Sequence, residues 1–189
     1  RGENTNYNLT VGNTRDEGFI ENNTYQRLNL STGGTTKLSN GFTFSTVMNY
    51  VKTDKTAPPT ASAFGSAAAA PSVFANILYT PRNLDLFGIP YENPIDRSSV
   101  NYRNDIPNPR WTLKNSSDNE SVRRFFANFT ASYELNSWSN VSYRLAIDNY
   151  TQTKLYYINK GNGQPFDTEG FMRTTVNENL IYDHTVSYN

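Results

Sequence analysis

The chain has 189 residues, and its 17 basic and 17 acidic side chains give a formal net charge of zero at neutral pH. This balance argues against a nucleic-acid partner and against a polybasic membrane anchor. Cysteine is absent, which excludes disulfides, thiolate metal sites and a cysteine nucleophile. Aromatic residues make up 14% of a chain that is also rich in Asn, Ser and Thr, and this mixture favours a β-sheet with one face in water.

Alternation of apolar and polar residues predicts three strands before the middle of the chain. They lie at about 7–11, 25–31 and 42–50. We expect a charged, Gly-containing connection at 12–23 between the first two. Gly33 and Gly34 mark the start of the next reversal. Asn40 and Gly41 follow them, and both residues are able to adopt positive φ.

The alternation disappears between about 52 and 120. Connections of this length inside a domain are usually functional or disordered. We expect residues 61–79 to form one or two short helical turns around Pro71. The later aromatic residues and prolines predict an ordered loop that packs on itself.

Two long strands joined by a tight turn are predicted for 121–158. Every odd position is apolar or aromatic in 125–135 and again in 141–147, while most even positions are polar. Each arm is about twice as long as the average strand of about 5 to 6 residues. Such a length matches a strand that crosses a membrane at a tilt, for which about 9 to 11 residues are needed.

The last part of the chain completes a set of six expected strands. The alternation of apolar and polar residues becomes irregular at 150–158, which predicts either a β-bulge or a strand that continues beyond its apolar part. A turn region follows at 161–165, and the final strand is expected at about 174–188. Short connections follow the second and fourth strands, whereas longer ones follow the first, third and fifth. In outer-membrane barrels the short turns face the periplasm and the long loops face outside.

We therefore predict an all-β fold, an antiparallel transmembrane β-barrel segment with long extracellular loops, the longest at about 52–120. Aromatic residues near strand ends, such as Tyr50 and Trp138, fit the interfaces of a membrane. Six strands are too few to close a membrane barrel, for which about eight is the minimum. The whole chain, 1–189, is therefore expected to be a partial barrel domain in the bacterial outer membrane, with lipid on one surface.

On this interpretation the two faces of the strands have different surroundings. Polar residues expected to face the lumen are Arg27, Asn29, Thr43, Ser45, Asn49, Asn128, Thr130, Arg144 and Asp148. Apolar residues expected to face lipid are Leu28, Leu30, Phe42, Phe44, Phe125, Phe129, Val141, Leu145 and Ile147. The polar residues are interpreted as a hydrated wall rather than as a ligand site. Arg144 is expected to form a charge network there with Asp148 or Glu134.

Ligand contacts are expected in the long loop, because binding residues concentrate on loops held by a rigid scaffold. Tyr91, Tyr102 and Trp111 have rings that are able to stack on a sugar or hold a peptide. The alternative, which is favoured, is that these rings hold the loop together or meet a partner protein. The single histidine, His184, has no nearby nucleophile or metal-ligand spacing. No catalytic site, metal or cofactor is therefore expected.

Four short motifs resemble the SusC/RagA family of TonB-linked outer-membrane transporters of Bacteroidetes. They are DEG followed by NTYQR within 16–27, YTPRNLDL at 79–86, NPRWTL at 108–113 and YELNSW at 133–138. The resemblance implies a barrel of about 22 strands around an N-terminal plug. It also implies import of oligosaccharides or oligopeptides, a SusD-like surface lipoprotein as partner, and energy supplied through TonB. The plug, the TonB-contacting segment and the other strands are expected outside these 189 residues.

A second interpretation is a secreted or surface β-sandwich that acts as an adhesin or carbohydrate-binding module. Alternating strands also occur where one face of a sheet packs on a core. Two observations argue against this arrangement. The strands are long, and turn signals do not recur at the spacing of about 8 to 12 residues that is typical of sandwiches. The sandwich predicts a second sheet over Phe125 and Phe129, which a structure is able to test.

Overall fold

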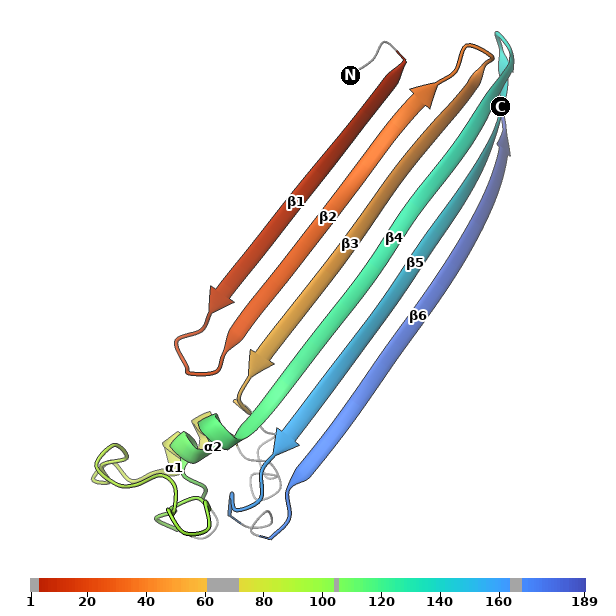
Figure 1. The fold of residues 1–189 in the computed structure, drawn as a ribbon. Coiled ribbons are helices and arrows are strands. Elements are labelled where there is room, and N and C mark those ends of the chain that lie inside the picture. Colours follow the sequence, from red (N-terminus) through yellow and green to blue (C-terminus); the bar gives the residue numbers. More distant parts are fainter. Residues whose placement is uncertain (1–3, 61–71, 104–105, 164–167) are drawn as a thin grey trace.

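The computed structural model describes residues 4–60, 72–103, 106–163 and 168–189. All six strands belong to one antiparallel sheet in the order β1-β2-β3-β4-β5-β6 (Figure 1). The strands are β1 (Thr5–Glu17), β2 (Thr24–Lys37), β3 (Phe42–Ala57), β4 (Ser116–Asn136), β5 (Ser139–Ile158) and β6 (Phe171–Tyr188). Two short helices, α1 (Val73–Tyr79) and α2 (Pro109–Asn115), lie between β3 and β4 in the chain. The expected all-β antiparallel fold is confirmed.

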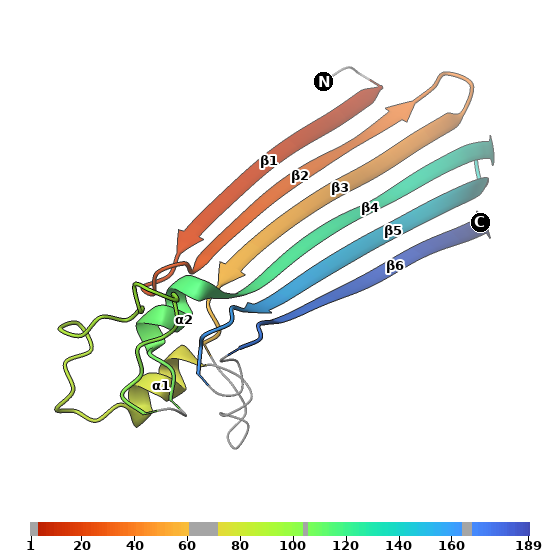
Figure 2. The same ribbon diagram turned by 60° about the horizontal axis from the view of Figure 1, so that its bottom comes forward.

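The sheet is a single layer with two free edges. Each strand pairs only with its neighbours in sequence, so β1 and β6 form the edges and the sheet does not close on itself. Figures 1 and 2 show the long strands side by side, with both helices beyond one end of the sheet. No second sheet is present among the described residues. The two-layered arrangement of a β-sandwich is therefore not found in this part of the chain.

Most strands are longer than their alternation predicted. β1 continues to Glu17, so the connection expected at 12–23 shrinks to 18–23. β3 continues to Ala57 and β4 begins at Ser116, which corrects the long loop from about 52–120 to 58–115. The final strand likewise begins earlier than expected, at Phe171. These added residues are largely polar on both faces, so no alternation marks them as strand.

The connections differ in length between the two ends of the sheet. The ranges 38–41 and 137–138 are tight turns at one end, whereas 18–23, 58–115 and 159–170 lie at the other (Figure 1). Gly41 has a φ of 87°, as expected for this turn, whereas Asn40 does not adopt a positive φ. The expected difference between short and long connections is confirmed, although the first of the long connections is only moderately long.

Gly33 and Gly34 lie inside β2 and not in a reversal. A Cβ on Gly33 would lie 2.8 Å from Oδ1 of Asn8, and a Cβ on Gly34 would lie 3.1 Å from the backbone oxygen of Asn6. The glycines therefore permit close approach of β1 to β2. Composition alone made them look like a turn.

Most of the large buried side chains gather at the long-loop end beyond the sheet, while few of those on its two faces are buried. Trp111, Val73 and Ile158 are among the largest fully buried side chains, and α1 packs against α2. We call the described residues 58–60, 72–103 and 106–115 the loop module. Residues 61–71, which include Pro71 and part of the expected helical turns, lie outside the described residues, while α1 occupies the rest of that stretch.

Candidate functional site

The strand register places one continuous set of apolar and aromatic side chains on one face of the sheet. In antiparallel pairs, residues directly opposite each other project to the same side. Leu30 pairs with Tyr50, and Tyr50 pairs with Phe125. Following the same register, we call the apolar face the side that carries Leu9, Val11, Leu28, Leu30, Phe42, Phe44, Met48, Tyr50, Phe125, Phe129, Tyr133, Val141, Tyr143, Leu145, Ile147, Leu180, Tyr182 and Val186.

The opposite side, which we call the polar face, carries the residues that the alternation assigned to a lumen. Arg27, Asn29, Thr43, Ser45, Asn49, Asn128, Thr130, Arg144 and Asp148 all lie on it. The nine residues assigned to lipid all lie on the apolar face. The register therefore separates the two sets completely, as period-two alternation requires.

Ion pairs link neighbouring strands across the polar face. The Arg124 guanidinium donates two hydrogen bonds to the Asp148 carboxylate, of 3.0 and 2.6 Å. Arg144 lies 3.5 Å from the Asp183 carboxylate, and Lys37 lies 2.9 Å from that of Glu134. The expected pairing of Arg144 with Asp148 or Glu134 is therefore wrong, because each of those carboxylates has another partner. Such exposed pairs contribute about 0 to 1 kcal/mol each, so they shape the charge of this face more than its stability.

The apolar face changes character along the strands. In β4 its apolar part runs from Leu135 to Phe125, which is about 34 Å along the strand at about 3.4 Å per residue. At a tilt of about 40° this length corresponds to a height of about 26 Å, close to the apolar band of about 25 Å in outer-membrane barrels. Beyond Phe125 the same face carries Arg123 and Ser121. The pairing of β5 over 150–158 is regular, so the weakened phase there reflects continuation beyond the apolar part and not a bulge.

Aromatic rings collect near the tight-turn end of the apolar face. The Phe42 and Tyr133 ring centroids lie 4.5 Å apart, and Phe42 also stacks with Phe44 at 6.0 Å. Tyr143 and His184 are hydrogen-bonded at 2.6 Å between the hydroxyl oxygen and Nδ1. This contact gives the single histidine a partner on the sheet, so its polar ring atom is satisfied on an otherwise apolar surface.

Trp111, one of the three proposed ligand-stacking residues, is 0% exposed at the centre of the loop module. Its indole Nε1–H donates a hydrogen bond of 2.8 Å to the carbonyl oxygen of Arg97. Both faces of the ring are therefore occupied by the protein itself. In this structure Trp111 holds the loop together, which is the alternative that the sequence also allowed.

Tyr91 and Tyr102 are also engaged within the loop module. The Arg110 guanidinium lies 4.9 Å from the Tyr91 ring centroid, and the Lys114 ammonium lies 5.3 Å from it. The Tyr102 hydroxyl donates a hydrogen bond of 2.5 Å to the carbonyl oxygen of Tyr79. Tyr91 is half-buried, whereas Tyr102 remains partly exposed. The structure does not bring the three proposed rings together into one open cleft.

Side chains of the loop module also cap and fix its backbone. Asn108 is the N-cap of α2, where its side-chain oxygen accepts a hydrogen bond of 3.0 Å from the backbone N–H of Arg110. Arg110 in turn donates to the carbonyl oxygen of Leu86 at 2.8 Å. The hydroxyl and backbone N–H of Ser98 both donate to the Asp96 carboxylate and hold its pKa below the usual value. These bonds stabilise one loop conformation.

A contact between the two longest connections was not predicted from the sequence. Asn162 is fully buried, and its side-chain oxygen accepts a hydrogen bond of 3.1 Å from the Thr112 hydroxyl. The backbone N–H of Ser99 donates to the carbonyl oxygen of Gly161 at 2.6 Å. The only signal in the sequence is the Gly161-Asn162-Gly163 run, which reads as an ordinary turn. Residues 159–163 and the loop module therefore form one packed surface at this end of the sheet.

Replacing Gly161 with alanine is expected to separate these two connections. Gly161 has a φ of 88°, and a Cβ there would lie 2.9 Å from Cα of Ser98. A non-glycine residue in such a conformation costs about 1 to 3 kcal/mol. Hydrogen exchange at the amides of Ser99 and Thr112 should become faster. Gly12→Ala is the matched control, because the nearest atom to its Cβ is 3.7 Å away. Equal exchange in the two variants would contradict the close contact.

The described residues contain no group of three or more His, Asp or Glu side chains that is able to hold a metal ion. Within the same ranges, no helix is both long and apolar enough to cross a membrane. No model of a known protein family matches the chain, and no curated protein is significantly similar to it.

Proposed function

We propose that this chain is part of the wall of an outer-membrane barrel, and that this barrel belongs to a TonB-dependent importer of oligosaccharides or oligopeptides. The observation that supports the proposal most directly is the contrast between the two faces of a single-layer sheet. One face carries ion pairs such as Arg124 with Asp148, and the other carries Phe44, Phe129 and Leu145 with no cover among the described residues.

Lipid is the surrounding that suits the apolar face. Phe125 and Phe129 keep 37% and 38% of their surface exposed, and the same is true of large side chains on all six strands. Monomeric soluble proteins rarely expose apolar patches beyond about 300 to 600 Å². A sheet spans a bilayer only if its backbone groups are paired, and the band height of about 26 Å derived above meets the apolar thickness of such barrels.

The two free edges support a larger barrel. The outer sides of β1 and β6 present unpaired backbone N–H and C=O groups, which lipid cannot satisfy. Further strands beside β1 and β6 would pair these groups and close the wall. A barrel of about 22 strands, as the family resemblance implies, is wide enough to hold a plug. The polar face would then line the lumen and contact plug or cargo.

The motif at 108–113, one of the four that carry the family resemblance, forms the start of α2 and the centre of the loop module. Asn108 caps α2, Pro109 occupies its first turn and Trp111 fills the centre of the loop module. A SusD-like lipoprotein would meet the long-loop end of the wall, and TonB would act through parts of the protein outside these residues. The exposed Phe87 and Ile95 place apolar surface at that end. The aromatic and amide side chains of the long loop suit sugar and peptide cargo equally.

Fractionation of cells tests the membrane part of the proposal. We expect the full-length protein to pellet with outer membranes and to require detergent for extraction, because the apolar face is stable only in lipid. Recovery of the full-length protein in a detergent-free soluble fraction would refute the barrel.

Uptake measurements test the transport part. Cells that make the full-length protein should take up a labelled oligosaccharide or oligopeptide mixture faster than cells that lack it. A protonophore should abolish the difference, because TonB-linked import needs energy from the inner membrane. Uptake that is unchanged by the protonophore would indicate passive diffusion through a pore and would contradict energy-coupled import.

A further inference from the structure

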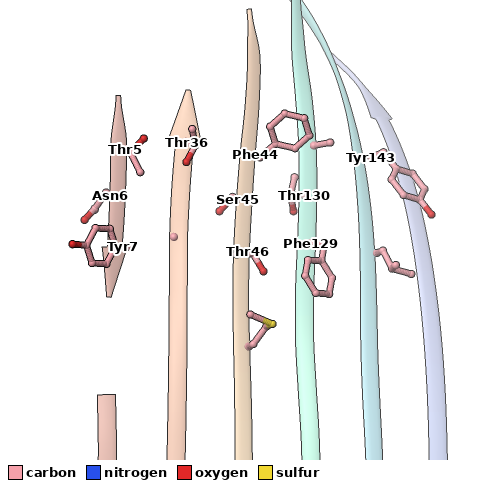
Figure 3. A pocket seen from close by; sticks show the side chains of 14 residues that line it. Thr5, Asn6, Tyr7, Thr36, Phe44, Ser45, Thr46, Phe129, Thr130 and Tyr143 are labelled. Atoms are coloured by element: carbon pink, nitrogen blue, oxygen red, sulfur yellow. The ribbon is translucent and has the colours of Figure 1, made fainter. Parts of the chain in front are cut away.

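The apolar face is grooved. A depression of about 460 Å³ is lined by side chains from five strands, and a second one of about 210 Å³ lies next to it. Met48 lines both, so the two depressions meet there. Figure 3 shows the larger depression, with Phe44, Phe129 and Tyr143 around Thr46.

Small residues make this groove. Gly34, which pairs with Thr46, and Ala131, which pairs with Phe44, both line the depression and add little side-chain volume there. The larger rings of Phe129 and Tyr143 stand beside these positions. The smaller depression continues the groove along the strands, between Leu30, Tyr50 and Phe125.

Two cations stand at the long-loop end of the groove. Lys52 pairs directly with Arg123 in the row of residues that follows Tyr50 and Phe125 on the same face. Like charges opposite each other on neighbouring strands are destabilising. Asp54 lies 2.9 Å from Lys52 and offsets one of the two charges. Arg123 is exposed and forms no ion pair within the described residues, so the end of the groove carries an excess positive charge.

Other charged groups on this face lie farther from the groove. Glu178 faces the same side but is two strands from Arg123, since it pairs with Thr151 of β5. Strands are about 4.8 Å apart, so the backbones of Glu178 and Arg123 are about 10 Å apart, and no ion pair joins the two side chains among the described residues. Arg15 on β1 has its own partner, Glu17, at 3.0 Å. Neither neighbour therefore cancels the one net positive charge that Lys52, Arg123 and Asp54 carry together.

We propose that this groove binds an anionic membrane lipid, with one acyl chain along Met48 and Thr46 and the head-group phosphate between Lys52 and Arg123. The inference rests on the proposed membrane position of the apolar face. From Phe44 to Tyr50 the groove covers about 20 Å along β3, and Lys52 stands one row beyond its end. This length exceeds the depth of one leaflet, about 15 Å, so an acyl chain fits along it. Charge complementarity selects an anionic head group.

Native mass spectrometry of the full-length protein in neutral detergent tests this site with phosphatidylglycerol as the probe. The double variant Lys52→Gln/Arg123→Gln should bind this lipid about 25-fold more weakly, from about fivefold for each cation near an anionic surface. Ala131→Leu should also weaken binding, because it fills the groove without changing strand pairing. The control Lys55→Gln/Arg173→Gln removes the same charge from the polar face, and its binding should be unchanged.

Three results would overturn the lipid site. They are equal binding of phosphatidylcholine and phosphatidylglycerol, equal losses in the test and control double variants, and displacement of the lipid by inorganic phosphate at similar concentration. Each of these results is compatible with a protein that inserts into bilayers, so it would refute the lipid site without refuting the barrel. A full-length protein that needs no detergent would instead remove the barrel itself.

Discussion

Replacing Trp111 with alanine is expected to unfold the loop module while the sheet keeps its pairing. The side chain is fully buried, and truncation of a buried Trp costs about 3 to 5 kcal/mol. The carbonyl oxygen of Arg97 also loses its donor. Limited proteolysis of the membrane-inserted full-length protein should show new cleavage within 72–115, and the strands should remain protected.

A matched control is Trp138→Ala in the tight turn between β4 and β5, where the ring is 76% exposed. Its proteolysis pattern should equal that of the unchanged protein. Trp111→Phe keeps one aromatic ring but loses the hydrogen bond, worth about 1 kcal/mol, and part of the ring volume, so it should loosen the loop less than Trp111→Ala. Resistance of Trp111→Ala to cleavage in the loop would show that the indole does not hold it.

Placing an arginine on the apolar face at Phe129 is expected to be the most damaging single change to the sheet. Arginine on the lipid side of a barrel costs about 2 to 4 kcal/mol at the bilayer midplane. Phe129 lies within the apolar part of β4, and its ring is 38% exposed. Denaturant titration of the full-length protein refolded into lipid vesicles should show this loss.

Asn128→Arg is the control, since Asn128 is the adjacent residue on the polar face. The denaturant concentration at which this variant is half unfolded should stay close to that of the unchanged protein, because water surrounds the polar face in the proposed lumen. Equal losses in the two variants would mean that both faces have the same surroundings. The lipid assignment of the apolar face would then be wrong.

The face of each central strand was predictable from sequence, and its ends were not. Alternation from 125 to 135 assigns Phe125 and Asn128 to opposite sides because neighbouring side chains in a strand always alternate. At the ends of β1 and β3 both sides are polar, as at Arg15 and Lys52, so the pattern vanishes while backbone pairing continues. Gly33 and Gly34 misled the prediction because glycine marks both turns and close backbone approach.

Contacts between distant residues needed the structure. Arg144 pairs with Asp183 because the register of β5 on β6 brings them together, and no local spacing encodes that register. For Trp111 the sequence left ligand stacking and loop packing both open, with packing favoured, because an aromatic residue in a loop is able to serve either role. The buried Asn162 gave no periodic signal at all. Loop interiors are built from such irregular contacts.

The two helices have a consequence for the order of assembly. The backbone N–H of Val73 donates to the carbonyl oxygen of Pro59, just after β3, and α2 runs directly into β4 at Ser116. Because α1 packs on α2, they act as a clasp that brings the end of one strand beside the start of the next. Closing a connection as long as 58–115 has an entropy cost that opposes the pairing of β3 with β4. Early docking of α1 on α2 would offset this cost, so we expect β3 and β4 to begin pairing at the end that lies next to the helices.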